Sequence, residues 1–248
     1  MTTNEIALKE NERIDDLHRN GYKLIQNPNF FCFGVDTVLL SDFCKIKIGD
    51  KVLDLGTGNG VLPILLSAKS KNAHFTGLEI QEESADMATR SVRLNSLEDM
   101  ISIQKGDIKN LTSIFKHASF DVIVSNPPYM EPCGGILSMD SPKAIARHEV
   151  LCNLNDIISG ASKMLRFAGR FYIVHKPHRV ADILTTLRTH SMEAKTMRFV
   201  QSYDEKDPNM MLIEATRGGK SMCKVLPPLI IYKENGTYTD EVNKIYYD

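Results

Sequence analysis

Short apolar stretches alternate with amphipathic stretches along most of this chain, beginning near Lys51. The apolar stretches are rich in β-branched residues, which is typical of strands, and the stretches between them repeat apolar residues at helical spacing. Strands are expected at residues 51–55, 74–79, 100–104, 120–125, 169–174, 193–200 and 209–215, and helices at 61–68, 82–95, 154–165 and 178–190. Because strands that alternate with helices form parallel sheets, we expect an α/β fold with a doubly wound, mostly parallel seven-stranded sheet and helices on both faces.

The pattern changes at both ends of the chain. Residues 16–26 and 30–33 are expected to form a small strand pair, followed by a helix at 36–44. Near the other end we expect a strand at 225–232 and a short helix at 240–247. We therefore divide the chain into an N-terminal cover (1–48), a central domain (49–217) and a C-terminal appendage packed on the same domain (218–248).

The alternation of strands and helices in the central domain is also interrupted once, between residues 130 and 150. Prolines and glycines in its first half make a helix there improbable, so we expect a long loop. Loops of this length inside a compact domain usually either carry function or are disordered.

Composition narrows the class of protein. The chain has 248 residues, 42% of them hydrophobic and 25% charged, with a net charge of −1, so it is not a basic nucleic-acid binder as a whole. Its five cysteines show no paired or zinc-like spacing, which favours reduced thiols, a cytoplasmic location and no metal. No apolar run has the length of a membrane span, so no membrane partner is expected.

One segment departs from this charge balance. Residues 157–181 contain no acid but several basic side chains, among them Lys163, Arg166 and Lys176. A solvated surface and a contact to RNA phosphates explain this pattern equally well.

The first predicted strand runs into a glycine loop, Asp54–Gly60 (DLGTGNG), before the first helix of the central domain. Backbone amides at such a strand-to-helix turn favour a carboxylate or another anion. The spacing Gly-x-Gly-x-Gly differs from that of dinucleotide-binding loops, and Asp54 lies where a pyrophosphate would be repelled. An amino group would instead be attracted there.

Acids also follow the next two predicted strands. Glu79 ends one strand at the distance where a carboxylate can hold ribose hydroxyls, and Asp107 with Ile108 follows the other. Each acid taken alone is better explained as a loop, helix or turn cap. Three acids at three successive strand ends instead describe S-adenosylmethionine, which has an amino group, a ribose and an adenine but no phosphate.

The strand at 120–125 ends in Asn126-Pro127-Pro128-Tyr129. Each proline fixes its own backbone and holds the preceding residue extended, so the corner is rigid. It combines the Asn126 amide oxygen, the Pro127 main-chain carbonyl and the Tyr129 ring, a set that suits a planar group bearing an NH2.

With these motifs the chain resembles the class I S-adenosylmethionine-dependent methyltransferases of Rossmann-like fold that carry an Asn-Pro-Pro-Tyr signature. Three further stretches are similar to the bacterial enzymes that methylate an adenine in the anticodon loop of valine tRNA: 31–40 (FCFGVDTVLL), 147–149 (RHE) and 236–246 (GTYTDEVNKIY). The resemblance implies tRNA as substrate, and we expect a monomer or a weak dimer.

The resemblance also implies residue roles. Asn126, Pro127 and Tyr129 would receive the substrate nitrogen. The cofactor would be bound by Phe33, Asp36, Thr37, Asp54, Gly56, Gly58, Gly60, Glu79, Ile80, Asp107, Ile108 and Asn126. The RNA would be contacted by Pro128, Tyr129, Arg147, His148, Lys163, Arg166 and Lys176.

Rival functions share part of this pattern. Methylation of the glutamine amide in release factors uses the same tetrapeptide, but those enzymes usually carry a sizeable N-terminal helical domain, and about 50 residues leave little room for one. An rRNA amino-methyltransferase also stays open, whereas DNA adenine methylation needs a target-recognition domain. A nicotinamide-dependent oxidoreductase is disfavoured by the glycine spacing, and a non-catalytic binding module by the complete set of site residues.

Overall fold

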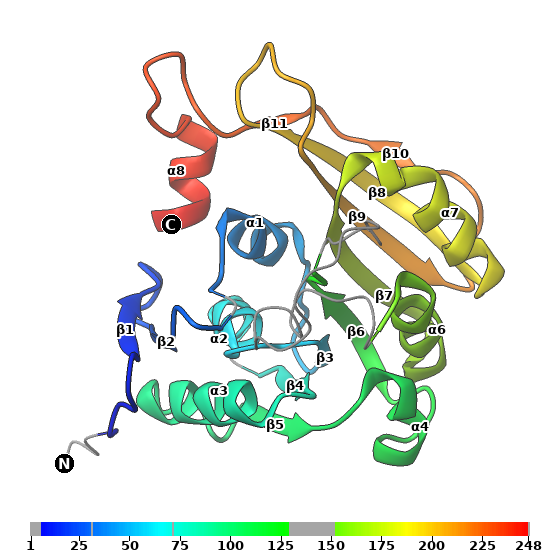
Figure 1. Ribbon diagram of the computed structural model, residues 1–248. Helices are drawn as coiled ribbons and strands as arrows, with labels where there is room; N and C mark the ends of the chain where they lie inside the picture. The colour runs from blue at the N-terminus through cyan, green and yellow to red at the C-terminus, as the bar shows by residue number, and fades with distance from the viewer. Residues whose placement is uncertain (1–5, 31, 71, 129–151, 248) are drawn as a thin grey trace, which may run out of the picture.

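The protein, seen as a computed structural model, is built around one large twisted sheet (Figure 1). The structure describes residues 6–30, 32–70, 72–128 and 152–247. The strands of the sheet are β3 (Lys51–Leu55), β4 (His74–Glu79), β5 (Ile101–Lys105), β6 (Phe120–Ser125), β7 (Leu165–His175), β8 (Met192–Gln201), β9 (Met210–Arg217), β10 (Lys224–Val225) and β11 (Leu229–Ile230). Their order is β10-β8-β9-β7-β6-β3-β4-β5, and β11 also pairs with β8.

The seven predicted strands form the body of this sheet. The five neighbouring strands β7, β6, β3, β4 and β5 are parallel to one another. Strand β9 runs antiparallel to both of its neighbours, β7 and β8. The predicted fold class is therefore confirmed. The single strand expected at 225–232 is wrong: two short strands, β10 and β11, pair with β8 on either side of Pro227 and Pro228. Neither proline has an N–H to donate to a ladder, so the strand breaks there.

Helices cover both faces of the sheet (Figure 1). One face packs on α1 (Val35–Phe43), α2 (Val61–Ser67), α3 (Glu82–Leu94) and α8 (Asp240–Tyr247). The other packs on α4 (Leu111–Ile114), α6 (Leu154–Met164) and α7 (Val180–Thr189), with the short 3-10 turns η1 (Ile108–Asn110) and η2 (Pro177–Arg179) leading into two of them. No helix of the described residues is long and apolar enough to cross a membrane.

The pleat of the strands explains the two cores. Val52 of β3 belongs to the cluster on the first face and Leu53 to the cluster on the second, and Val122 and Ile123 of β6 divide in the same way. Successive side chains of a strand point to opposite faces, so strands covered on both sides are apolar throughout. This is why consecutive apolar residues, and not an alternation of apolar and polar ones, form the centre of β3 and β6 in the sequence.

The N-terminal strand pair differs from the prediction. β1 (Arg13–Asp16) pairs antiparallel with β2 (Lys23–Gln26), and Phe30 lies in a turn outside any strand. The chain reverses within the segment that the pattern treated as one strand, because Asn20 and Gly21 adopt positive φ angles of 51° and 68°. Such angles suit the turn of a hairpin.

The topology fixes where a ligand can bind. From β3 the chain proceeds outward through β4 and β5, then returns to the other side of β3 as β6. The sheet order therefore reverses between β3 and β6. In open α/β sheets such a reversal leaves a crevice beyond the carboxyl ends of the two strands. Asp54 lies near the end of β3, and Asn126 directly follows β6.

Candidate active site

The glycine loop after β3 is held in one conformation by strand β4. Gly56, Gly58 and Gly60 all have positive φ angles, of 76°, 57° and 84°, which glycine adopts without the strain of a side chain. The amides of Gly56 and Thr57 donate to the Leu78 carbonyl, each at 3.0 Å. The loop therefore packs directly against the end of β4.

Asp54 is a buried acid without a partner. It is 1% exposed, and neither carboxylate oxygen has a hydrogen-bond partner among the described residues. Burial is the main reason that the pKa of Asp54 is raised to about 7; the nearby Thr57 hydroxyl acts against that rise, and the charge of Glu79 adds a smaller contribution to it. An unpaired buried carboxylate is costly, so this side chain is set up to receive a cation or a hydrogen-bond donor.

Glu79 shapes the loop from the neighbouring strand. Its Oε2 accepts from the Gly58 amide at 2.8 Å, and its Oε1 accepts from the Gln81 amide at 2.9 Å. Burial raises the pKa of Glu79, and these backbone hydrogen bonds act against that rise. A carboxylate oxygen can accept more than one hydrogen bond, so both roles considered for Glu79, a backbone cap and a ligand for hydroxyls, fit the geometry.

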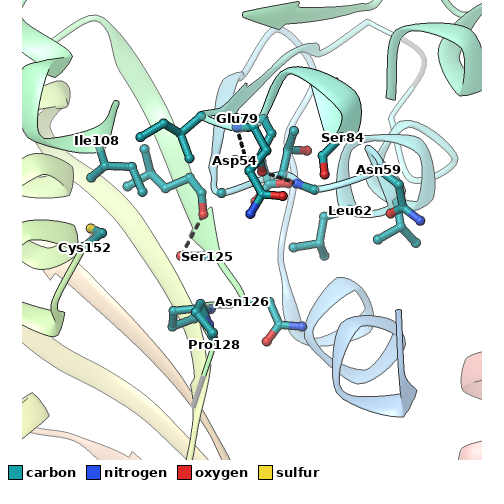
Figure 2. A pocket seen from close by; sticks show the side chains of 18 of the residues that line it. Asp54, Asn59, Leu62, Glu79, Ser84, Ile108, Ser125, Asn126, Pro128 and Cys152 are labelled. Atoms are coloured by element: carbon teal, nitrogen blue, oxygen red, sulfur yellow. Dashed lines mark hydrogen bonds between the residues drawn. The ribbon is translucent and has the colours of Figure 1, made fainter. Parts of the chain in front are cut away.

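A pocket of about 150 Å³ opens between these acids and the end of β6 (Figure 2). Its wall includes the predicted residues Thr37, Asp54, Gly56, Gly58, Glu79, Ile80, Ile108, Asn126, Pro127 and Pro128. A smaller hollow adjoins it and is lined by Asp107 as well as Ile80 and Ile108. In Figure 2, Asn126 and Pro128 lie on one side of the space, with Asp54 and Glu79 across from them.

The Asn-Pro-Pro corner forms the β6 side of the pocket. The Asn126 side-chain nitrogen donates to the Thr37 hydroxyl of α1 at 2.9 Å. This bond joins the N-terminal helix to the end of β6. Tyr129, the last residue of the signature, lies outside the described residues.

The pocket therefore combines an acidic, glycine-rich end with an amide at its opposite wall. Two buried acids with raised pKa values favour a ligand with positive charge and hydroxyl groups and disfavour a pyrophosphate. The apolar side chains of Ile80 and Ile108 line both the pocket and the adjoining hollow and suit a flat ring. These features fit an amino acid joined to a nucleoside.

Comparisons with known proteins decide the family. Residues 46–217 match the family model described as a methyltransferase domain. This chain belongs to that methyltransferase family. The resemblance drawn from the motifs is thereby confirmed.

Relatives and solved structures agree with this assignment. The methyltransferase is 31% identical over 193 residues to the tRNA1(Val) (adenine(37)-N6)-methyltransferase of Bacteroides thetaiotaomicron, covering 77% of this chain and 79% of that protein. It is 28% identical over 216 residues to the enzyme of the same name from Porphyromonas gingivalis, covering 84% of each. Among solved structures, a predicted O-methyltransferase from Agrobacterium tumefaciens superposes with a TM-score of 0.69 at 20% identity, over 85% of this chain and 95% of that one.

Four residues expected at the cofactor lie outside the wall of the pocket in the described structure. Phe33 packs against the core on the α1 face. Asp36 precedes Thr37 in α1, and its side chain accepts a hydrogen bond from the Thr37 amide at 2.8 Å. Gly60 allows a close approach instead, because a Cβ there would lie 3.1 Å from the Cβ of Ala88 on α3. Asp107 lines only the adjoining hollow, where its side chain also accepts from the Lys109 amide.

The basic residues proposed for RNA do not gather in one place. Lys176 follows the last residue of β7, and because Ser125 pairs with Ile173 it lies at the same edge as Asn126. Lys163 and Arg166 lie at the opposite edge, since Leu165 pairs with Phe120 at the start of β6 and Arg166 bonds Asp121 there. The structure therefore does not bring Lys163 and Arg166 to the pocket. Arg147 and His148 lie outside the described residues.

The pocket wall also contains residues that the sequence analysis did not name. They include Thr57, Asn59, Ser84, Cys152 and Ile157. Thr57 and Asn59 occupy the variable positions of the glycine loop, so the motif itself was a signal for them. Ser84 lies in the first turn of α3, which begins three residues after Glu79, so the position of that acid was a signal for it. Cys152 and Ile157 are brought in by tertiary packing, which no local motif reports.

Gly77 supports the loop from within β4 and gives a testable prediction. A Cβ there would lie 2.8 Å from both Cγ2 and Oγ1 of Thr57. We expect Gly77→Ala to lower the free energy of unfolding by about 1–3 kcal/mol, the usual cost of overpacking, and to weaken cofactor binding by displacing the loop. Urea unfolding and calorimetry measure the two effects. The Cβ of Thr57 would also lie only 2.9 Å away, so Thr57→Gly is the matching second change. It should restore part of the stability, and no recovery would contradict this steric cause.

Proposed function

We propose that this methyltransferase transfers a methyl group from S-adenosylmethionine to the exocyclic N6 of an adenine in the anticodon loop of valine tRNA. The observation that carries the proposal is the position of Asn126, which faces the same pocket as Asp54 from the end of β6. The names of both relatives described above state this reaction at adenine 37. A cytoplasmic location, where tRNA is found, belongs to the same proposal.

The residues present fit the donor. Asp54 would pair with the ammonium of its amino-acid end, and the amides of the glycine loop would approach its carboxylate. Glu79 would accept from ribose hydroxyls, while Ile80, Asp107 and Ile108 would hold the adenine. When bound, the sulfonium supplies an electrophilic methyl group. The protein's share in the reaction is to hold the attacking nitrogen in line with that group, and such positioning can account for much of the rate enhancement.

The Asn-Pro-Pro corner acts on the attacking nitrogen. The lone pair of an adenine amino group is delocalised into the ring, which makes it a poor nucleophile. The Asn126 side-chain oxygen and the Pro127 carbonyl would each accept one N–H, which favours a pyramidal nitrogen with its lone pair directed at the methyl group. No general base is needed before transfer, because the nitrogen becomes acidic only afterwards.

The rest of the signature would hold the base and the RNA. Tyr129, next along the chain, would stack on the adenine, a contact worth about 1–3 kcal/mol in single-strand binders. A base in a loop leaves its stack more readily than one in a duplex. Lys176, at the same edge as Asn126, would contact the RNA backbone, and Arg147 and His148 remain part of this proposal.

Total tRNA incubated with labelled S-adenosylmethionine tests the proposal directly. The expected product is N6-methyladenosine in a single tRNA species, identified by nucleoside analysis and by hybrid selection of valine tRNA. Incubation in parallel with rRNA and with release factors covers the two rival substrates. Label that appears only on a release-factor glutamine or only on rRNA would overturn the tRNA assignment.

A further inference from the structure

The contact between Thr37 and Asn126 joins two parts of the site that come from distant segments of the chain. Thr37 lies in the first turn of α1 and is 1% exposed. Its hydroxyl accepts a hydrogen bond from the side-chain nitrogen of Asn126 at 2.9 Å. The bond is a property of the described side chains and does not depend on any ligand.

Asp36 determines which partner donates in this contact. Its Oδ1 accepts from the Thr37 amide at 2.8 Å and lies 3.4 Å from the Thr37 hydroxyl oxygen. A hydroxyl has a single hydrogen and two lone pairs. Because the carboxylate attracts that hydrogen, the lone pairs of Thr37 are turned toward Asn126. They can pair with the NH2 group of an amide but not with its oxygen.

The helix that carries this pair is packed into the core. Leu39 and Leu40 of α1 are 1% and 0% exposed, and the helix packs against α2, β7 and α8. Interiors packed in this way resist displacement by even a methyl group's width. The position of the Thr37 hydroxyl relative to β6 is therefore fixed by the core.

We propose that Asp36 and Thr37 set the orientation of the Asn126 amide, which makes Thr37 a positioning residue for methyl transfer. The inference rests on the proposed function, because only an amine substrate needs an acceptor at this point. With the NH2 bonded to Thr37, the amide oxygen is the atom oriented to accept from the substrate nitrogen. An amide turned by 180° would present N–H groups to an amine that itself carries N–H groups, and the two would repel.

The alternative role for Thr37 is a direct contact with the cofactor, since it also lines the pocket. The two roles differ in what they stabilise. A cofactor contact contributes to the affinity for the cofactor. An orienting contact contributes to turnover, because the misoriented amide fails only when the amine must be bound for transfer.

Substitution of Thr37 by valine and by serine in the full-length protein separates these roles. Valine has the size of threonine without the hydroxyl, whereas serine keeps the hydroxyl. We expect Thr37→Val to lower kcat on tRNA by about 10- to 100-fold with the Kd for S-adenosylhomocysteine within about threefold of wild type, the loss expected when a buried polar group is left unpaired. Thr37→Ser should recover most of the lost kcat.

A double-mutant cycle with Asn126→Ala gives a second readout. Thr37→Val is expected to have no further effect on kcat in that background, since the amide that it orients is gone. If Thr37→Val does not fold, Thr37→Ala is measured in the same way. Thermal unfolding of each variant confirms that the protein compared is folded.

The outcomes separate the two proposals. A wild-type protein that transfers no methyl group to tRNA overturns the proposed function. If wild type is active, the orienting role alone is overturned by a Thr37→Val variant with unchanged kcat, by a loss of S-adenosylhomocysteine affinity that accounts for its loss of activity, by failure of serine to rescue, or by full additivity with Asn126→Ala.

Discussion

Replacing Asn126 by alanine is expected to lower kcat on tRNA by about 100- to 1,000-fold, the range found when one preorganised polar group at a reacting centre is removed. The change deletes the side-chain oxygen proposed to accept from the substrate amine. Cofactor affinity should stay within a few-fold of wild type, because the acids proposed to bind the donor, Asp54 and Glu79, belong to β3 and β4. Single-turnover methylation and calorimetry with S-adenosylhomocysteine measure the two quantities.

Asn95→Ala is the matched control for this experiment. Asn95 directly follows α3, at the end of that helix away from the pocket. Its side-chain amide donates to the carbonyls of Lys23 and Ser91, each at 2.7 Å. Its loss should reduce thermal stability and leave kcat close to wild type. Equal losses of turnover and cofactor affinity in Asn126→Ala would show that Asn126 supports the pocket and not the substrate nitrogen.

The fold was largely predictable from the sequence because the central strands are buried on both faces. Most of their buried positions are apolar, and the predicted bounds of β3, β4 and β6 agree with the structure. The prediction failed where turn chemistry decides. Asn20 and Gly21 reverse the chain inside the segment 16–26, and the prolines at 227 and 228 split the last strand. In both places single residues override a pattern that is read over longer windows.

The site was predictable to the extent that it follows strand ends. Asp54, Glu79 and Asn126 are each found at the carboxyl end of a parallel strand, where sheet topology brings them together. Which edge a basic residue occupies could not be predicted in the same way. Arg166 and Lys176 belong to one segment that contains basic residues and no acid, yet β7 separates them by nearly its whole length and places Arg166 against Asp121.

The hydrogen bond between Asn126 and Thr37 also could not be predicted from the sequence. The motifs identify Thr37 and Asn126 separately, but 89 positions separate them and neither predicts the other. The unpaired state of Asp54 is similar. The sequence predicts a carboxylate near the end of a strand, and only the packing shows that both of its oxygens are buried without hydrogen-bond partners. Such a group destabilises the free protein, and sites commonly retain such costs because a ligand relieves them.

The ligand-free protein should accordingly be less stable when Asp54 is charged. The folded-state pKa of about 7 lies above the ordinary aspartate value, so between about pH 4 and pH 7 the folded state holds a proton that the unfolded state has lost. Stability from this group is therefore present at low pH and is lost as the pH rises through 7. Asp54→Asn removes this dependence, and at pH 8 the ligand-free variant is expected to melt at least as high as wild type.

Cofactor binding should show the opposite pH dependence. The ligand's ammonium pairs with the ionised form of Asp54, so affinity for S-adenosylhomocysteine is expected to be about tenfold weaker at pH 6 than at pH 8, in proportion to the ionised fraction. Binding near pH 7 should release a proton. Calorimetry in buffers of different ionisation enthalpy measures that release.

Asp54→Asn is expected to lose this affinity and its pH dependence together. Removing one member of a buried charge pair costs about 2–5 kcal/mol, which corresponds to a Kd raised by about 30- to 4,000-fold. Asp121→Asn is the matched control, because Asp121 accepts from the Lys51 amide at 2.7 Å at the opposite edge of the sheet. That change should alter stability alone. An affinity that is flat from pH 6 to 8 in wild type, or unchanged in Asp54→Asn, would mean that the buried acid does not bind the cofactor's amino group.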